Sequence, residues 1–303
     1  MNDGVLVVDK PVGPTSHDVV ARVRRATRIS RIGHTGTLDP LASGVLPLVI
    51  GRATRLAQFL TADRKEYVAD VRFGATSATY DAEGPIAQSE SARVCSADDV
   101  AAALDAFRGT FAQTPPPFSA KKVEGRRAYK LARRDEPVAI PPVDVTVEML
   151  DLLSFDGEVA RLRVVSSSGF YVRSLAHDLG QRLGCGAYLQ ALRRTRAGSF
   201  DLDAATALEA IEREGTAALE RLVPMEQVLI GVPAVRLTPD GLRRASHGNS
   251  IRPSDIIGPW PPDHGPRTAD GGPRYQLLTP DGELLAVAER GPDGALHPTI
   301  VLV

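Results

Sequence analysis

Hydrophobic and polar residues alternate with a period of two in two segments, residues 67–73 and residues 159–166. Successive side chains of a strand point to opposite faces, so this period predicts a half-buried β-strand in each segment. The two apolar faces consist of Tyr67, Ala69, Val71 and Phe73, and of Ala160, Leu162 and Val164. Continuous apolar runs at residues 5–8 and 45–50 predict two further strands.

Capping residues and apolar spacing predict three helices in the first half of the chain. One begins at Ser16, which can cap it, and the others cover residues 53–60 and 97–108. Ser96 precedes the third helix and can cap it in the same way. Residues 113–118 cannot be helical, because each of three consecutive prolines lacks the backbone N–H that a helix needs.

The clearest helical pattern follows a serine-rich turn at residues 166–169. Its apolar stripe consists of Val172, Leu175, Ala176, Leu179 and Leu183. Gly184 comes directly after this stripe and can end the helix. Arg173 falls in the first turn, beside the stripe and not opposite it. A side chain in that position can reach over the edge of the core into a cleft.

Beyond about residue 230 the chain changes character. Short apolar runs alternate with three turn signals, which are Thr238-Pro239-Asp240-Gly241, Thr279-Pro280-Asp281-Gly282 and Gly291-Pro292-Asp293-Gly294. Residues 258–273 are rich in proline and glycine and predict a loop. We therefore expect two domains, residues 1–230 and a small β-rich domain of residues 231–303. Strands mixed with helices, without a regular βαβ order, predict the α+β class.

The composition is that of an ordinary globular protein, with 303 residues, 43% hydrophobic residues, 24% charged residues and a net charge of −1. The N-terminal apolar run is too short for a signal peptide, and no later run is long enough to cross a bilayer. Cys95 and Cys185 are the only cysteines and lie far apart in sequence, so no disulfide framework is expected. These features predict a reduced, cytoplasmic environment.

Basic residues concentrate in three segments, residues 22–31, 121–134 and 193–196. Acidic residues concentrate elsewhere, at residues 81–99 and 201–220. A protein of nearly neutral charge can still hold a phosphate backbone on one basic face. Solvated helix faces without a ligand are the alternative interpretation of each basic segment.

The stretch GHTGTLDPLASG, residues 33–44, places one carboxylate, Asp39, after two glycines and directly before Pro40. Glycine permits backbone angles that are closed to other residues, and Pro40 moves Asp39 towards an extended conformation. Either the loop is an ordinary turn in which aspartate is favoured, or its conformation serves to hold the Asp39 carboxylate in a fixed direction. An aspartate can act as a nucleophile or a general base, and a nearby arginine would keep it ionised.

Other catalytic patterns do not occur in the sequence. The six histidines and two cysteines show no spacing that would gather metal ligands, so no metal site is predicted. The stretch GHTGTLDP lacks the lysine–serine or lysine–threonine ending of a phosphate-binding P-loop. No Gly-x-Ser-x-Gly nucleophile elbow is present.

Five ordered segments resemble the TruB family of tRNA pseudouridine synthases. They are VLVVDKPVGPTSHDVV, GHTGTLDPLASGVLPLVIGRATR, RKEYVADVRFGATSATYDAEG, QTPPPFSAKKVEGRRAYKLAR and SSSGFYVRSLAHDLGQRLGCGAYLQALRRTRAG. The resemblance runs from about residue 4 to about residue 225, and the C-terminal part is similar to a PUA-like RNA-binding module. It implies a catalytic domain of the pseudouridine synthase type, built on a mixed, mainly antiparallel sheet.

The resemblance also implies an activity, the isomerisation of uridine to pseudouridine at position 55 in the T loop of tRNA. The base is detached, turned and rejoined through carbon after the nucleotide has flipped out of its stack. Neither a metal nor an organic cofactor is implied. The expected partner is the T-arm stem-loop of tRNA; we expect a monomer with no membrane contact and no obligate protein partner.

Matching motifs assign catalysis to Asp39, Arg173 and Tyr67, and substrate binding to His34, Leu192 and Lys10. The resemblance implies that Asp39 is the essential carboxylate, that Arg173 pairs with it, and that Tyr67 stacks against the flipped base. His34 fills the space that the base leaves, and Leu192 lines the pocket. Lys10, in the N-terminal motif, is expected to support the active-site loops.

Each of these residues also has an ordinary alternative role in a turn, the core or the surface. Two other functions therefore stay open, a relative on the same scaffold that modifies another RNA with the help of partner proteins, and an RNA-binding or RNA-folding protein without catalysis. The combination of Asp39, Tyr67 and Arg173 favours an enzyme over a pure binding protein. The recognisable segment at residues 113–134, together with the compact C-terminal domain, favours an enzyme that acts alone.

Overall fold

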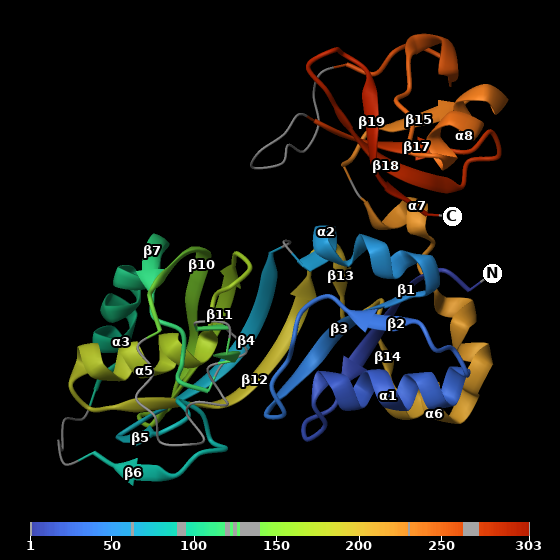
Figure 1. Cartoon of the computed structure of the whole chain (residues 1–303). Coiled ribbons are helices and arrows are strands. Elements are labelled where there is room, and N and C mark those ends of the chain that lie inside the picture. Colours follow the sequence, from blue (N-terminus) through green and yellow to red (C-terminus); the bar gives the residue numbers. More distant parts are fainter. Residues whose placement is uncertain are drawn as a thin grey trace.

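Two β-sheets organise the protein (Figure 1). The computed structural model describes residues 2–61, 64–89, 95–118, 140–229, 231–262 and 273–302, and the backbone of residues 122–123 and 126–127. A ten-stranded sheet occupies the first part of the chain and a five-stranded sheet the last part. Both contain parallel and antiparallel pairs, with antiparallel pairs in the majority, which confirms the predicted α+β class.

The path of the large sheet is β14 (Thr206–Ala207), β1 (Gly4–Lys10), β3 (Ala42–Ile50), β12 (Ala187–Ala197), β4 (Lys65–Phe73), β11 (Val159–Ser166), β10 (Val143–Phe155) and β7 (Gly109–Gln113). β2 (Ile32–His34) pairs with β3, and β13 (Phe200–Asp201) pairs with β12. At the centre, β12 is parallel to β3 and antiparallel to β4. Segments that are far apart in sequence therefore meet in the middle of the sheet.

The predicted alternation in β4 and β11 is confirmed. Ala69 and Leu162 pair across the two strands, and both are fully buried on the core face. On the opposite face Arg161 donates two hydrogen bonds to the carboxylate of Asp70. Such cross-strand pairs of opposite charge stabilise the register that the buried face requires.

The continuous apolar run in β1 reflects burial on both faces. Val5 and Val7 belong to an apolar cluster that includes Val287 of β18 and Leu302, which follows β19. Leu6 and its neighbours on the other face pack against α1 (Ser16–Thr27) and α6 (Leu208–Glu214). A strand that is covered on both sides needs no polar face, which explains the pattern.

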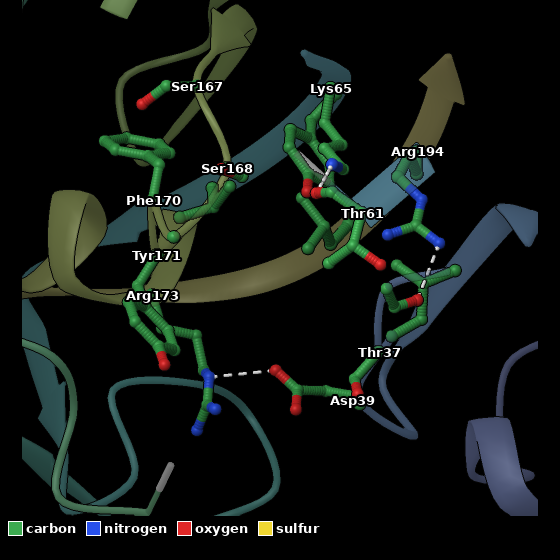
Figure 2. A pocket seen from close by; sticks show the side chains of 16 residues that line it. Thr37, Asp39, Thr61, Lys65, Ser167, Ser168, Phe170, Tyr171, Arg173 and Arg194 are labelled. Atoms are coloured by element: carbon green, nitrogen blue, oxygen red, sulfur yellow. Dashed lines mark hydrogen bonds and ion pairs between the residues drawn. The ribbon is translucent and has the colours of Figure 1, made fainter. Parts of the chain in front are cut away.

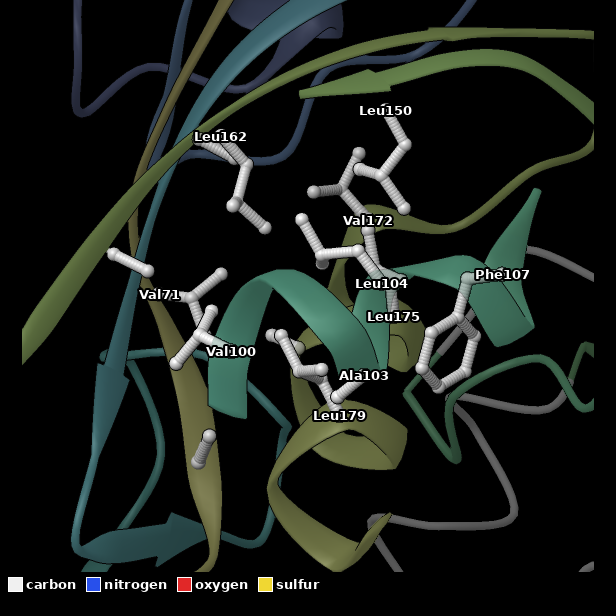
Figure 3. Packing of buried hydrophobic residues seen from close by; sticks show 14 of the residues in the cluster. Val71, Val100, Ala103, Leu104, Phe107, Leu150, Leu162, Val172, Leu175 and Leu179 are labelled. Atoms are coloured by element: carbon white, nitrogen blue, oxygen red, sulfur yellow. The ribbon is translucent and has the colours of Figure 1, made fainter. Parts of the chain in front are cut away.

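Two helices cover one face at the other end of the large sheet (Figure 1). They are α5 (Val172–Leu183) and α3 (Ala97–Leu104), and their apolar side chains interdigitate with those of β10 and β11 (Figure 3). As predicted, Ser96 caps α3, and Gly184 ends α5 with a φ of 72°. None of the helices in the described ranges has both the length and the apolar character that crossing a bilayer requires.

Two predictions about helix starts are wrong. Thr15, not Ser16, caps α1, because Thr15 and Asp18 form a reciprocal capping box and Ser16 turns inward. The segment 53–60 begins as a 3-10 helix, Gly51–Leu56, and only then becomes the short α2, Ala57–Thr61. The N-cap residue, Ile50, has no side chain that can cap the segment, and Asp3 instead accepts a hydrogen bond from the Arg52 N–H at 2.7 Å.

The C-terminal sheet has the order β16 (Ile256–Ile257), β15 (Ala234–Leu237), β17 (Arg274–Leu278), β18 (Leu284–Arg290) and β19 (Leu296–Val301). The predicted turn at residues 238–241 is instead the start of α8 (Pro239–Ser246). Thr238 is its N-cap and Pro239 its first residue, both of which are helix-start signals. The other two turn signals do form turns. Residues 263–272 of the predicted loop lie outside the described residues.

The remaining elements are shorter. They are β5 (Ala75–Ser77), β6 (Ile86–Gln88), β8 (Lys122–Val123), β9 (Arg126–Arg127), α7 (Met225–Val228) and the 3-10 helices Asp105–Phe107, Gly215–Arg221 and Pro253–Asp255. The division of the chain at residue 230 stays a prediction, since the apolar cluster around β1 includes side chains from both sheets.

The fold also brings the two cysteines together. Cys95 precedes α3, Cys185 follows α5, and their sulfur atoms lie 3.5 Å apart in a buried site. No disulfide bond joins these two sulfur atoms. Their separation in the sequence gives no sign of this contact.

The packing of α5 predicts a large cost for removing one of its core side chains. Leu175 is fully buried between α5 and the sheet, so Leu175→Ala should lower the free energy of unfolding by about 2–5 kcal/mol. Urea denaturation followed by circular dichroism measures this change. Leu153→Ala is the control, because Leu153 is 50% exposed and its loss should change stability by no more than about 0.5 kcal/mol. Equal effects of the two substitutions would contradict the described packing.

Candidate active site

A cavity of about 260 Å³ lies where β4, β12 and the start of α5 meet the loop of residues 36–39 (Figure 2). Four of the six predicted site residues line it, namely Asp39, Tyr67, Arg173 and Leu192. The other two, His34 and Lys10, are not among its lining residues. Because these four residues come from four separate parts of the chain, the pocket exists only in the folded protein.

An ion pair between Asp39 and Arg173 spans one side of the cavity (Figure 2). The Nε atom of Arg173 lies 3.0 Å from Oδ2 of Asp39. The arginine side chain is only 8% exposed, whereas that of Asp39 is 38% exposed, through the cavity. The carboxylate is therefore accessible to a ligand while the guanidinium that orients it is sheltered.

Further contacts hold Arg173 in place from the side away from Asp39. Its Nη1 atom lies 3.3 Å from Oδ2 of Asp81 and donates to the carbonyl oxygen of Thr79 at 3.3 Å. Its Nη2 atom donates to the carbonyl oxygen of Phe118 at 3.0 Å. Asp81 is 2% exposed and pairs with Arg173 inside the protein. From the sequence it is only the first residue of the acidic segment 81–99. Its place in the family-like segment TYDAEG was the available signal.

Two opposing effects act on the ionisation of Asp39. Removal from water raises the pKa of this carboxyl above its ordinary value, although part of its surface faces the cavity. The positive charge of Arg173 lowers the pKa, the negative charge of Asp81 raises it, and Lys10 lowers it, and the net direction is upward. A partly dehydrated carboxylate with a raised pKa is more basic than a free one, which suits proton transfer or nucleophilic attack.

Side chains of Ser16 and Lys10 fix the backbone around Asp39 by hydrogen bonds. Ser16 accepts a hydrogen bond from the Leu38 N–H at 2.8 Å and donates one to the Leu38 carbonyl at 3.1 Å. The Lys10 ammonium donates to the Ala42 carbonyl at 2.6 Å. Lys10 has no exposed surface, and burial lowers its pKa to about 8. This position fits the predicted support of the active-site loops.

Arg194 connects the loop of residues 36–39 to the wall of the pocket. Its Nε atom donates to the Val45 carbonyl at 2.7 Å, and its Nη2 atom donates to the Gly36 carbonyl at 3.2 Å. It also hydrogen-bonds to the side chain of Tyr67. Arg194 belongs to the basic segment 193–196, for which a solvated surface is the ordinary interpretation, but the residue is 1% exposed and lies in the interior. The buried carbonyls it satisfies explain why an arginine is tolerated there.

A glycine permits this close packing. Gly44 has a φ of 102°, and a Cβ atom at this position would lie 2.1 Å from the Arg194 carbonyl oxygen. Because that contact is with backbone, no side-chain rotation could relieve it. The strand β3 can therefore approach β12 at Arg194, which lines the pocket, only with glycine at this position.

Tyr67 and Leu192 form the apolar part of the pocket wall. They lie on the adjacent strands β4 and β12, and both pack against the cores on either side of the pocket. An aromatic face beside an aliphatic side chain provides a surface on which a flat ring can stack.

His34 lies on β2, next to the loop of residues 36–39 and outside the cavity lining. Its Nδ1 atom accepts a hydrogen bond from the Gly36 N–H at 3.4 Å, and its ring contacts that of His17 edge to face, with centroids 5.4 Å apart. Burial and the neighbouring His17 lower the pKa of His34, which favours the neutral ring. The structure thus places His34 at the base of the loop that carries Asp39.

The basic segments are less uniform than their composition indicates. Arg22 pairs with Glu212, and Arg24 donates to the Ile32 carbonyl, so both have roles within the protein. The side chains of segment 121–134 lie outside the described residues. Among the side chains that the structure does describe, no three histidine, cysteine, aspartate or glutamate residues gather to hold a metal ion.

Comparison with known proteins decides the family. A model of the TruB family pseudouridylate synthase N-terminal domain matches residues 24–172, and a model of the tRNA pseudouridylate synthase B C-terminal domain matches residues 173–230. The tRNA pseudouridine synthase B of Solibacter usitatus (strain Ellin6076) is 44% identical over 304 residues, which cover 99% of this chain and 100% of that protein. The chain belongs to the TruB family of pseudouridylate synthases. The enzyme of the same name from Thermobifida fusca (strain YX) is 41% identical, with 99% of each chain covered.

Solved structures of TruB-like proteins share the fold. One, a Cbf5-Nop10-Gar1 complex, has a chain that is 26% identical, with a TM-score of 0.74 over 99% of this chain and 85% of that one. Another, an H/ACA RNP bound to a substrate RNA containing 2'-deoxyuridine, has a TM-score of 0.73 at 25% identity, over 100% of this chain and 86% of that one. Pseudouridine contains the same atoms as uridine, so a member of the TruB family is an isomerase, and this protein is an enzyme of that class.

The ion pair predicts a measurable change in the ionisation of Asp39. Because the charge of Arg173 lowers the pKa of Asp39, Arg173→Gln should raise that pKa further above its ordinary value. Carboxyl ¹³C NMR of aspartate-labelled protein, with Asp39→Asn for assignment, follows the titration. Arg161→Gln, which breaks the exposed pair with Asp70, should leave the titration of Asp39 unchanged. An unchanged Asp39 pKa in Arg173→Gln would show that the ion pair does not control this carboxyl.

Proposed function

We propose that this enzyme converts uridine to pseudouridine at position 55 in the T loop of tRNA. The observation that carries the proposal is the Asp39–Arg173 pair at 3.0 Å, set in a cavity that Tyr67 and Leu192 also line. Full-length relatives named tRNA pseudouridine synthase B, at 44% and 41% identity, support tRNA as the substrate. The lower identity of 25–26% to the chains of the solved complexes makes the weaker alternative a relative that modifies another RNA with the help of partner proteins.

The dimensions of the site suit a single nucleotide. The cavity of about 260 Å³ lies just below the range of roughly 300–1,000 Å³ in which drug-sized ligands bind. A uridine inside a folded T loop is stacked, so it has to flip outward to enter. Tyr67 then stacks on the uracil ring, and Leu192 limits its position from the neighbouring strand.

The chemistry begins at the bond between C1′ of the ribose and N1 of the uracil. The Asp39 carboxylate either attacks the nucleoside or assists departure of the base. The C1′–N1 bond breaks, the uracil turns, and a bond forms between C1′ and C5. The C5 proton is lost and N1 gains a proton, so that atoms and charge balance. Arg173 orients the carboxylate throughout, and its own orientation depends on Asp81.

The same proposal includes the cofactor requirement, the oligomeric state and the cellular location of the enzyme. The steps above use only side chains of this protein and the RNA, and they require no metal or organic cofactor. We propose that the enzyme acts as a monomer in the cytoplasm, without an obligate protein partner. Activity of the purified protein alone on an unmodified T-arm stem-loop tests this point, and light scattering gives its mass in solution.

Replacement of the catalytic carboxylate should separate binding from chemistry. Asp39→Asn keeps the size of the side chain and removes its charge, so the rate of pseudouridine formation should fall by at least about 100-fold. Affinity for the stem-loop should remain close to that of the wild-type protein. Chemical mapping of pseudouridine and a filter-binding assay measure the two quantities. Normal turnover by Asp39→Asn would remove this residue from the mechanism, and binding without product by the wild-type protein would favour an RNA-binding function.

A lysine cannot reproduce the contacts of Arg173. Arg173→Lys keeps the positive charge, but one ammonium cannot span Asp39, Asp81 and two carbonyl groups in the same geometry. Loss of one charged hydrogen bond, about 1.5–3 kcal/mol, should lower the single-turnover rate by about 10- to 150-fold. Arg161→Lys, at an exposed pair on the opposite face of the sheet, is the matched control and should keep the wild-type rate. A similar loss in both variants would contradict the specific role of Arg173.

A further inference from the structure

The turn that holds Arg173 contains an unusual backbone conformation. Tyr80 has a φ of 65°, in the left-handed region that glycine normally occupies. Among the described non-glycine residues this φ sign recurs at Arg28, which ends α1 in the ordinary way for a helix. Tyr80 ends no helix. A bulky residue in this region is disfavoured, and such strain persists only where surrounding contacts fix it.

Tyr80 stands between two of the residues that hold Arg173, Thr79 and Asp81. The carbonyl of Thr79 accepts a hydrogen bond from Arg173, and the carboxylate of Asp81 pairs with it. The ring of Tyr80 stacks on that of His177, with centroids 3.8 Å apart and planes at 7°. His177 lies four residues after Arg173 on α5, so the two side chains share one face of that helix. Three consecutive turn residues thus contact two successive positions on one helix face.

His177 contributes the face of its ring to the stack with Tyr80. The Nδ1 atom of His177 is buried and has no hydrogen-bond partner among the described residues. Burial also lowers the pKa of His177, which favours the neutral ring. A histidine that leaves a buried nitrogen unsatisfied is held there by its stacking surface, because offset stacked rings attract each other beyond the area they bury.

The other side of the turn is attached to the sheet. The Leu189 N–H of β12 donates to the Tyr80 carbonyl, and the Ala82 N–H donates to the Leu189 carbonyl, both at 3.0 Å. These two bonds fix the turn along β12. The stack adds an attachment to α5 that does not depend on Arg173 itself. The turn is therefore held at two places, with Asp81 between them and aimed at the guanidinium.

We infer that the stack of Tyr80 on His177 is a clamp that positions Thr79 and Asp81, and through them Arg173, against Asp39. Tyr80 and His177 are positioning residues in this account, since neither lines the cavity. The inference rests on the proposed function for its kinetic consequence. Loss of either ring should leave RNA binding intact and slow the chemical step, because the ion pair then samples orientations that do not support reaction.

Four single variants separate the ring from the backbone. Tyr80→Asn tolerates the left-handed conformation without an aromatic ring, and Tyr80→Phe keeps the ring. His177→Ala removes the partner ring with a residue of the best helix propensity, and His177→Phe keeps a flat ring. The single-turnover rate on an unmodified T-arm stem-loop at saturating enzyme should fall by about five- to tenfold in Tyr80→Asn and His177→Ala, near the upper end of what an aromatic pair contributes. It should stay within about twofold of wild type in the two ring-keeping variants.

The double variant tests the contact itself. If the two rings act as a pair, Tyr80→Asn combined with His177→Ala should be no slower than either single variant. Phe155→Leu is the control, since it disrupts another aromatic pair, Phe73 with Phe155, at a distance from Arg173. It should lower the melting temperature without changing the rate at 25 °C. Additive losses in the double variant, or wild-type rates in Tyr80→Asn and His177→Ala, would overturn the clamp.

A second measurement does not need turnover. Loosening Arg173 reduces its effect on the carboxylate, so the NMR titration of Asp39 in Tyr80→Asn should move in the same direction as in Arg173→Gln. An unchanged titration would contradict the inference even if the wild-type protein formed no pseudouridine. Failure of the wild-type protein to form product would instead count against the proposed function, and the NMR result would still decide the clamp.

Discussion

The pairing of Asp39 with Arg173 is the interaction on which the rest of the site depends. A carboxylate that faces a partly dehydrated cavity needs a fixed positive charge nearby to remain ionised and oriented. The guanidinium in turn needs acceptors for its other N–H groups, and Asp81, Thr79 and Phe118 supply them. Each of these requirements places a constraint on a different part of the chain.

The large sheet satisfies these constraints by joining distant segments at its centre. The loop with Asp39 leads into β3, Arg173 begins α5, and β12 follows α5 and pairs with β3. Arg194 on β12 then reaches back to the loop through the Gly36 carbonyl. The geometry of the ion pair is consequently set by strand pairing and by buried hydrogen bonds, which vary little in a packed interior.

Periodicity predicts elements well where one face of an element is buried and the other is wet. The alternation in β4 and β11 and the apolar stripe of α5 are of this kind, and the family resemblance adds the residues that meet at the pocket. Features that depend on tertiary contacts could not be found in this way. Arg194 is a charged residue in a basic segment, which is typical of the protein surface. Only the close approach of β3 in the folded protein shows that it is buried.

The roles of Asp81 and Ser16 are hidden for a related reason. Both make their decisive contacts with residues far away in the chain, Arg173 for the first and Leu38 for the second. Local rules also compete with one another. The sequence Thr-Pro-Asp-Gly at residues 238–241 is compatible both with a turn and with the capped start of a helix. The packing of α8 against the C-terminal sheet favours the helix.

The shared apolar cluster around β1 has a consequence for how the chain can be divided. Val5 and Val7 are covered in part by Val287 and Leu302, which lie near the C-terminal end. A fragment ending at residue 230 would lack the C-terminal members of this cluster, and the apolar side chains that pack against them would become more exposed to water. The last part of the chain thus contributes to the core beneath the large sheet, and we expect the two sheets to unfold together.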